Sequence, residues 1–243
     1  MEKTNYIVAS AIIGASLIIG VLIHSVNLIK INKMGNTLGV TGSATITVDS
    51  DLAKLKASFS RSITESNLKS GYAQMKMDEA KVAKFLKDNG LTEEEYEISP
   101  VSMYEEYNYY KDMNIEVEKK YNLTQQVTIT SNDIEKVQKL SKKTEDLINM
   151  DVLYQSNNPE YYYTKLPDTR INLLPEAVAD AQKRAEAIAK STSRKVDTLE
   201  SADMGVVQVR EPNSVDVAEY GMYDTATIQK EIMITVRANF ILN

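Results

Sequence analysis

The chain has 243 residues, enough for one large domain or two small ones, and its 43% hydrophobic and 26% charged residues are typical of a globular protein. It has no cysteine and a single histidine, His24, which excludes disulfides, thiolate catalysis, zinc–sulfur sites and a histidine-based triad. The net charge is −6, and we expect no nucleic-acid partner because phosphate binding needs clustered Lys and Arg.

A long uncharged segment lies near the N-terminus. From Thr4 to Ile29 there is no Asp, Glu, Lys or Arg. As a helix, residues 6–29 would span about 35 Å, which exceeds the ~30 Å hydrocarbon core of a bilayer. After a short tail of residues 1–5, this segment predicts a single-pass transmembrane anchor with the lipid bilayer as its partner. The alternative is a cleaved signal peptide, which the length of the apolar run and the lack of a following Ala-x-Ala site disfavour.

Two further features concern this anchor. Small residues recur four apart along it, namely Ser10 with Gly14 and Ser16 with Gly20. Such spacing allows two helices to approach closely, although ordinary small-residue content explains it equally well. Lys3 precedes the segment, whereas Lys30 and Lys33 follow it. By the positive-inside rule, the lysines lean by one residue towards a cytoplasmic C-terminal domain.

The soluble domain, residues 38–243, follows a polar linker at 30–37 and begins with two alternating segments. Apolar and polar side chains alternate through residues 38–48 and 54–63, which predicts a hairpin of half-buried antiparallel strands. Arg61 interrupts the apolar face of the second strand.

The rest of the domain mixes helices with strands. Apolar stripes and capping residues predict three helices, over residues 67–89, 131–148 and 168–192. Alternation predicts further strands at 121–129 and at 232–242, and strand-like residues predict others at 95–104, near 152 and at 195–209. This order predicts an α+β fold of an antiparallel sheet with helices packed on one face, and residues 131–194 as a candidate sub-lobe.

No motif of a known catalytic or nucleotide-binding site occurs in the chain. A P-loop, a dinucleotide-binding glycine pattern and a G-x-S-x-G elbow are missing from the sequence. The runs Glu93-Glu94-Glu95 and Glu105-Glu106 are adjacent glutamates in polar segments, which favours solvated turns over a glycosidase carboxylate pair. We therefore expect no enzymatic activity, no cofactor and no metal site.

Tyrosine is abundant, with 14 Tyr and no Trp in the chain. Two clusters stand out: Tyr104, Tyr107, Tyr109 and Tyr110 around one turn, and Tyr161, Tyr162 and Tyr163 in a continuous run. Tyrosine combines a large contact area with a polar tip, which suits interfaces. The clusters are consistent with subunit packing, with cross-strand pairing at a sheet edge, or with a platform that binds a glycan or peptide.

Three segments resemble the SIMPL domain family, also called DUF541, over about residues 37–243. Val40-Thr-Gly42-Ser-Ala44, followed by Asp51-Leu-Ala53, is similar to the family's V-x-G-x-G and P-D-x-A opening, with Ala44 and Ser50 as departures. The second segment is a hairpin with a tyrosine-bearing turn. The third is the alanine-rich helix around residues 176–189, whose alanine face predicts close packing on a sheet or a helix. Ser191-Thr-Ser-Arg replaces the Leu-Gly that usually follows this helix.

The resemblance implies a protein of the bacterial cell envelope, similar to a periplasmic immunogenic protein of the family, that forms ring-like homo-oligomers and is linked to envelope or oxidative stress. It implies an extracytoplasmic domain, against the slight lysine bias, and no established catalytic activity. We therefore expect a membrane-anchored, self-assembling structural or interaction protein whose partner is itself. The alternative is an extracytoplasmic module that recognises a cell-wall glycan or peptide through the tyrosine-rich turns.

Overall fold

The structure, a computed structural model, describes residues 14–25, 36–106, 118–216 and 218–243. Residues 14–25 form a helix whose Leu, Ile and Val side chains are 57–65% exposed. Among the described residues, no helix is long and apolar enough to cross a membrane. The other residues of the predicted anchor, 6–13 and 26–29, lie outside the described part of the chain, so the anchor stays a prediction.

The small residues predicted to pack anchor helices lie in this same segment. A Cβ added at Gly14 or Gly20 would meet nothing within 4 Å. Ser16 is on the same helix, whereas Ser10 is outside the described residues. The packing prediction for these four residues is untested by a single chain.

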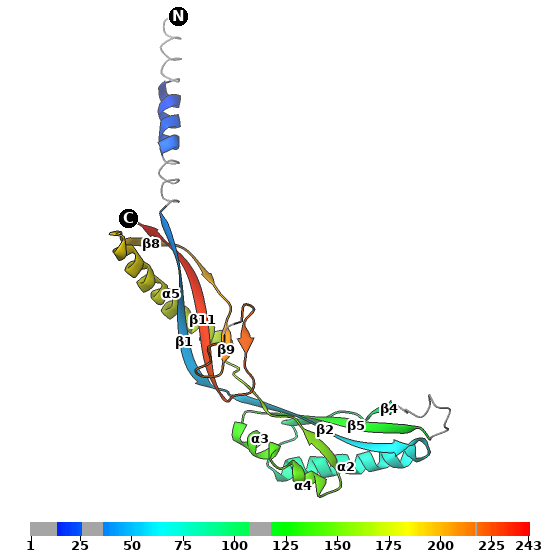
Figure 1. The fold of residues 1–243 in the computed structure, drawn as a ribbon. Helices are drawn as coiled ribbons and strands as arrows, with labels where there is room; N and C mark the ends of the chain where they lie inside the picture. The colour runs from blue at the N-terminus through cyan, green and yellow to red at the C-terminus, as the bar shows by residue number, and fades with distance from the viewer. Residues whose placement is uncertain (1–13, 26–35, 107–117, 217) are drawn as a thin grey trace, which may run out of the picture. The chain divides into compact units, whose positions relative to one another are not determined.

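From Thr37 onwards the chain alternates strands and helices, which confirms the α+β class (Figure 1). The strands are β1 Thr37–Asp49, β2 Leu52–Thr64, β3 Tyr96–Ile98, β4 Ser102–Glu105, β5 Lys120–Ser131, β6 Leu153–Ser156, β7 Glu160–Tyr162, β8 Val196–Met204, β9 Gln208–Arg210, β10 Met222–Tyr223 and β11 Gln229–Leu242. The helices are α2 Leu68–Asp88, α3 Ile134–Ser141, α4 Thr144–Ile148 and α5 Leu166–Ser191, with a 3-10 turn at Glu65–Asn67.

The strands form two sheets where the sequence predicted one. The first has the order β1-β11-β9-β10 with β8 also on β11, and the second has the order β3-β5-β2-β6 with β4 on β5 and β7 on β2. β9 and β10 are parallel, whereas β2 is antiparallel to β5, β6 and β7. Alternation identifies a strand and its buried face but not its partner, which is why the second sheet was missed.

The chain divides into two compact units. The unit that we call the α5 unit comprises residues 1–45, 169–207 and 233–243, and the α2 unit comprises 46–168 and 208–232. Strands β1 and β11 contribute residues to both units, and so does α5.

In the α2 unit, three helices lie on one face of the sheet that contains β2 and β5 (Figure 1). Alternate residues of the two strands point towards them and are buried: Ala53, Leu55, Ala57 and Phe59 in β2, and Leu123, Val127 and Ile129 in β5. They pack against Met75, Val82, Phe85 and Leu86 of α2, Val137 and Leu140 of α3, and Leu147 of α4. The opposite face carries the Ser and Thr residues that the alternation predicted to face outward.

The helix predicted over 131–148 is interrupted. The Asp133 side chain accepts a hydrogen bond from the Lys136 N–H at 2.9 Å and so caps the start of α3, as predicted. Lys142 and Lys143 then form a turn before α4 begins. The apolar stripe hid this break because both helices bury their apolar residues in the same core.

In the α5 unit, α5 packs on β1 and β11 through its alanine face. Ala181 and Ala185 are 0% exposed and cluster with Val40, Ala238 and Phe240. Alanine side chains allow a helix to lie close to a sheet, which the sequence predicted for this face. Pro175 lies inside α5, away from its first turn.

Candidate functional site

The tyrosines predicted as interface residues lie in different environments. Tyr104 on β4 is 55% exposed, whereas Tyr161 is 6% exposed and packs in the core of the α2 unit. Tyr162 and Tyr163 are half-buried. Three more lie outside the described residues: Tyr107, Tyr109 and Tyr110. Tyr161 is therefore part of the core, whereas Tyr104, Tyr162 and Tyr163 each have surface that a partner can contact.

Tyr162 is joined by a tyrosine that the two sequence clusters did not contain. Tyr223 of β10 stacks on it, with ring centroids 6.0 Å apart and an interplanar angle of 30°. The Tyr223 hydroxyl accepts a hydrogen bond from the Tyr163 N–H at 2.8 Å. The Tyr162 hydroxyl donates to Glu160 at 2.8 Å, which raises the pKa of Tyr162. Two stacked rings with polar groups beside them form a surface on which a sugar ring or a peptide could stack.

A buried lysine supports Tyr223. Lys230 is 0% exposed, and its ammonium donates to the carbonyl oxygens of Asp224 at 2.6 Å and Thr227 at 2.8 Å. Its Nζ also lies 3.3 Å from the Asp224 carboxylate and 5.8 Å from the centre of the Tyr223 ring. Burial lowers the pKa of Lys230, and the Asp224 carboxylate opposes that effect. Because all three N–H donors are engaged, Lys230 holds this turn in place and does not present a free amine.

Arg61, which interrupts the apolar face of β2, forms an ion pair with Asp78 of α2. Its Nε lies 2.5 Å from Asp78 Oδ2, its Nη2 lies 2.9 Å from Asp78 Oδ1, and Nη2 also donates to the Asp151 carbonyl oxygen at 2.9 Å. Asp78 is 1% exposed. The hydrogen bonds to this carboxylate raise the pKa of Arg61 above its usual value. The interruption in the alternation is thus explained by a buried partner on the facing helix.

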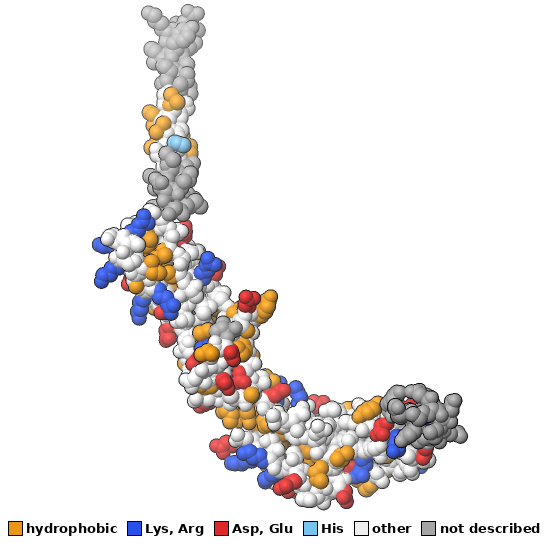
Figure 2. All heavy atoms as spheres, in the orientation of Figure 1, with side chains coloured by type: hydrophobic (Ala, Val, Ile, Leu, Met, Phe, Trp, Pro, Cys, Tyr) orange, Lys and Arg blue, Asp and Glu red, His pale blue; other side chains and the backbone are white. Residues whose placement is uncertain are grey.

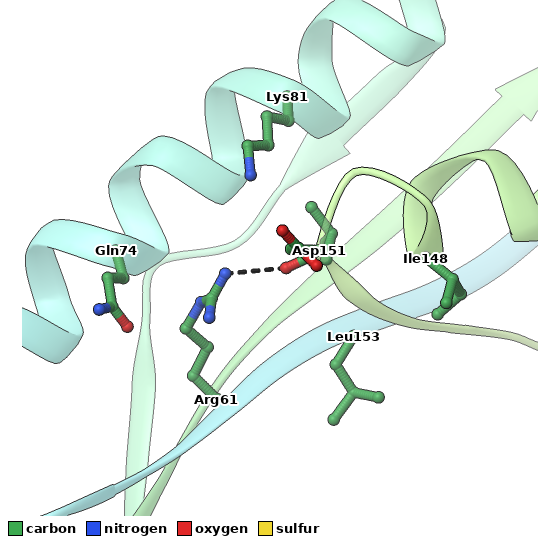
Figure 3. Close-up of a pocket in the computed structure, with 7 residues that line it drawn as sticks. Arg61, Gln74, Lys81, Ile148, Asp151 and Leu153 are labelled. Carbon is green, nitrogen blue, oxygen red and sulfur yellow. Dashed lines mark hydrogen bonds between the residues drawn. The ribbon is translucent and has the colours of Figure 1, made fainter.

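A pocket of about 560 Å³ lies beside Arg61 and is lined by Arg61, Gln74, Lys81, Ile148, Asp151, Val152 and Leu153; in Figure 3 the dashed line marks the hydrogen bond from Arg61 to Asp151. Its cations are already engaged. Lys81 Nζ donates to the Met150 carbonyl oxygen at 2.7 Å and lies 3.9 Å from Asp78 Oδ1. Because Asp78 and Asp151 balance the two cations, the pocket offers an anion little net attraction. We interpret the cluster as a latch that holds the turn between α4 and β6 against α2.

One glutamate of the acid run is part of a bonded turn and not a solvated side chain. Glu95 accepts hydrogen bonds from the Ser131 hydroxyl, from the Thr92 N–H at 2.9 Å and from Lys136 Nζ at 2.9 Å. These bonds, that of Ser131 foremost, lower the pKa of Glu95 to about 2. The expected solvated turn does describe Glu93, which pairs at the surface with Lys87.

Glu95→Gln should therefore flatten the acid limb of the stability profile. Because the folded-state pKa lies below the unfolded value, the carboxylate stabilises the fold above about pH 4.5, and this contribution is lost as the pH falls towards about 2. The side chain is 20% exposed, and the full difference is at most about 3 kcal/mol. Urea denaturation at pH 7, 4 and 2.5 measures it, with exposed Glu94→Gln as control. A wild-type advantage that does not change with pH would contradict the assignment.

In the α5 unit, β8 is an open edge strand. Among the described strands it pairs with β11 alone, and every residue after Val196 is exposed. Leu199 and Met204 are 45% and 51% exposed. Strands of this kind present unpaired main-chain groups to which another chain can pair. The sequence predicted a strand here, but its lack of cover depends on where α5 lies.

Within residues 14–25, 36–106, 118–216 and 218–243, no group of three or more His, Cys, Asp or Glu side chains could hold a metal ion. The most deeply buried charged groups, Asp78 and Lys230, are engaged by partners within the domain. That the protein is not an enzyme and takes no cofactor stays a prediction.

Comparison with known families gives one match. The sequence matches the family described as SIMPL, protein of unknown function (DUF541), over residues 38–240, which confirms the resemblance seen in the sequence. No curated protein matches the chain at a significant level. The matched range starts in β1 and ends in β11, so it draws on both units. The chain therefore belongs to the SIMPL (DUF541) family.

Proposed function

We propose that this SIMPL protein is a membrane-anchored, self-assembling interaction protein of the cell envelope, with its C-terminal domain outside the cytoplasm. The observation that carries the proposal is β8, an edge strand whose side chains are exposed on both faces. Folded proteins usually cover or guard such edges, and pairing with another chain is one way to cover them. Leu199 and Met204 add apolar surface that a neighbouring subunit would remove from water.

The anchoring part of the proposal rests on the uncharged segment from Thr4 to Ile29. Its described part, residues 14–25, is helical, and its apolar side chains are more than half exposed. A helix with this surface is favoured in lipid. Anchors in one membrane would raise the local concentration of the domains, so that weak contacts between them suffice for assembly. A ring-like assembly and a role in envelope stress are part of this proposal through family membership.

Size measurement of the full chain in detergent tests self-assembly. We expect a species several times heavier than the 27.2 kDa chain, by sedimentation equilibrium at micromolar protein. A strict monomer under these conditions would overturn the proposal.

Cysteine labelling tests the orientation. Because the chain has no cysteine, a single introduced one is the sole thiol. Glu94→Cys should react with a membrane-impermeant maleimide in intact cells, whereas Glu2→Cys should react only after lysis. The reverse pattern would place the domain in the cytoplasm.

A second candidate function is an extracytoplasmic binding module. The stacked pair of Tyr162 and Tyr223, with Lys54 Nζ 5.2 Å from the centre of the Tyr162 ring, favours it. Binding of cell-wall fragments that is lost in Tyr223→Ala but kept in Tyr104→Ala would support this function. No binding by the wild-type chain would count against it.

A further inference from the structure

The helix-side face of β8 is uncovered. Met204 lies opposite Val236 and Leu199 opposite Phe240 in the antiparallel pair of β8 and β11. Side chains directly opposite each other point to the same face of a sheet. Val236 and Phe240 are 1% and 3% exposed, whereas Met204 and Leu199 are 51% and 45% exposed. α5 thus covers β11 but not β8, which leaves a strip of apolar side chains on this face.

The other edge strand of the sheet, β1, is partly covered by α5. Beyond one end of β1 the Ser50 N–H donates to the carbonyl oxygen of Ile228, just before β11, and beyond the other end the Leu242 N–H donates to the carbonyl oxygen of Asn36. Successive residues of a strand direct their N–H groups to opposite sides, and Asn36 and Ser50 are both an odd number of residues from Ser43. The N–H of Ser43 therefore points away from β11. The Asp180 carboxylate of α5 accepts this N–H at 2.8 Å. One flank of α5 therefore runs along the outer edge of β1.

This flank of α5 carries both a cation and an apolar side chain. Asp180, Arg184 and Ile188 are spaced four residues apart and so lie in one stripe along the helix. Arg184 Nε lies 2.9 Å from Asp180 Oδ2, and its side chain remains 55% exposed. Ile188 is 46% exposed. The stripe offers a neighbouring surface a guanidinium and an apolar contact side by side.

β8 and the C-terminal end of α5 carry opposite charge. β8 holds three acids and no base: Asp197, Glu200 and Asp203. The segment from Lys183 to Lys195 holds five bases and one acid, and Figure 2 shows basic side chains gathered over α5. A two-fold pairing of β8 with β8 of a second copy would oppose like charges, whereas β8 against the basic end of α5, to which Arg184 of the flank belongs, opposes unlike ones.

We infer that a second copy of this chain covers β8, and that it does so with the β1-side flank of its α5. Leu199 and Met204 of one copy then lie against Ile188 of the next, with Glu200 near Arg184. The contact is heterologous, because each copy offers β8 to one neighbour and the α5 flank to another, so it propagates into a ring or a chain. The inference rests on the proposed self-assembly and names the two surfaces that meet.

Charge-reversal variants of the full chain, compared in detergent, test this contact. Glu200→Lys reverses a charge of β8, and Arg184→Glu reverses a charge of the α5 flank. Each variant alone should lower the mass of the assembly by about half or more at a fixed protein concentration. Because the contact is heterologous, an equimolar mixture of the two variants should regain the wild-type mass, with the copies alternating. The double variant should regain it as well.

Matched controls make the same charge changes in the α2 unit. Glu94→Lys and Lys69→Glu alter exposed side chains, and the assemblies that these variants form should have the wild-type mass. Leu199→Ser with Met204→Ser removes the apolar strip without changing charge and should lower the mass as the charge variants do. Circular dichroism melting checks that each variant is folded. If a charge variant does not fold, the serine variant replaces it in the test.

The outcomes separate the inference from the proposed function. If folded Glu200→Lys, Arg184→Glu and the serine variant all keep the wild-type mass, the contact is wrong although self-assembly stands. If the charge variants lose mass but neither the mixture nor the double variant regains it, these surfaces do not meet, and the inference is again wrong. A monomeric wild-type chain would instead overturn the proposed self-assembly.

Discussion

Gly42→Ala is expected to destabilise the α5 unit by about 3 kcal/mol or more. The added Cβ would lie 2.2 Å from the Ala177 carbonyl oxygen and 2.3 Å from the Ala181 nitrogen. These atoms belong to the backbone of α5, so no side-chain rotation relieves the clash, and the helix must move by about 1 Å. That movement would also lengthen the 2.8 Å hydrogen bond from the Ser43 N–H to Asp180.

Gly39→Ala is the matched control, in the same strand. Its Cβ would meet Asn239 Oδ1 at 2.8 Å, which is the end of a side chain that can rotate. We expect this variant to cost less than about 1 kcal/mol. Urea denaturation followed by circular dichroism compares the two. Equal losses would show that the close approach of α5 is not the reason for glycine at position 42.

Two of the segments that carry the family resemblance are the two sides of this contact. The first supplies Gly42 within β1, and the alanine-rich helix supplies Ala177 and Ala181. The sequence predicted a strand containing a glycine and a helix face suited to close packing. It could not predict that one packs on the other, because periodicity describes each element alone and carries no long-range pairing.

Where a strand has one buried face, the sequence predicted both the strand and that face, whereas β8 was predicted as a strand but not as one exposed on both faces. In β2, Phe59 is buried and Lys56 exposed, and such differences produce the alternation from which the strand was predicted. In β8, Glu200 and Leu199 are both exposed, so the pattern there did not indicate a buried face. β10 has two residues, too few for any period.

The candidate site was predictable only where it is local in sequence. The run at 161–163 indicated an aromatic surface, but Tyr223, which stacks on Tyr162, comes from a distant strand. The turn after α5 is a smaller example. Ser193 has a φ of 58°, a conformation that glycine usually adopts after a helix. A serine therefore takes this conformation in the turn where the family usually has Leu-Gly. Local composition did not indicate this conformation.

Arg61 was visible in the sequence as an exception, and its partner was not predicted. Asp78 lies three residues after Met75 and four before Val82, on the buried stripe of α2, whereas Asp88 is exposed near the end of the helix. Their difference in burial arises from the placement of α2 on the sheet. The two aspartates therefore allow a direct test of what burial adds to an ion pair.

Asp78→Ala should destabilise the α2 unit by about 3 kcal/mol. The change leaves the Arg61 guanidinium, whose side chain is 28% exposed, without its carboxylate, and Lys81 loses a charge 3.9 Å away. Both cations also hold carbonyl oxygens of the turn at 150–151. Urea denaturation measures the loss, and amide hydrogen exchange at residues 149–152 should speed up beyond the effect of global destabilisation, because the latch no longer fixes that turn.

Asp88→Ala is the control from the same helix. It removes an ion pair with Lys84 whose side chains are 61% and 73% exposed, and should cost less than about 0.5 kcal/mol. The double variant Arg61→Met with Asp78→Leu removes both charges and should recover most of the stability that Asp78→Ala loses, since an uncompensated cation is the main cost. If the double variant is as unstable as Asp78→Ala, the loss comes from the ion pair itself and not from the stranded charge. Equal effects of Asp78→Ala and Asp88→Ala would show that burial of this carboxylate adds nothing to the fold.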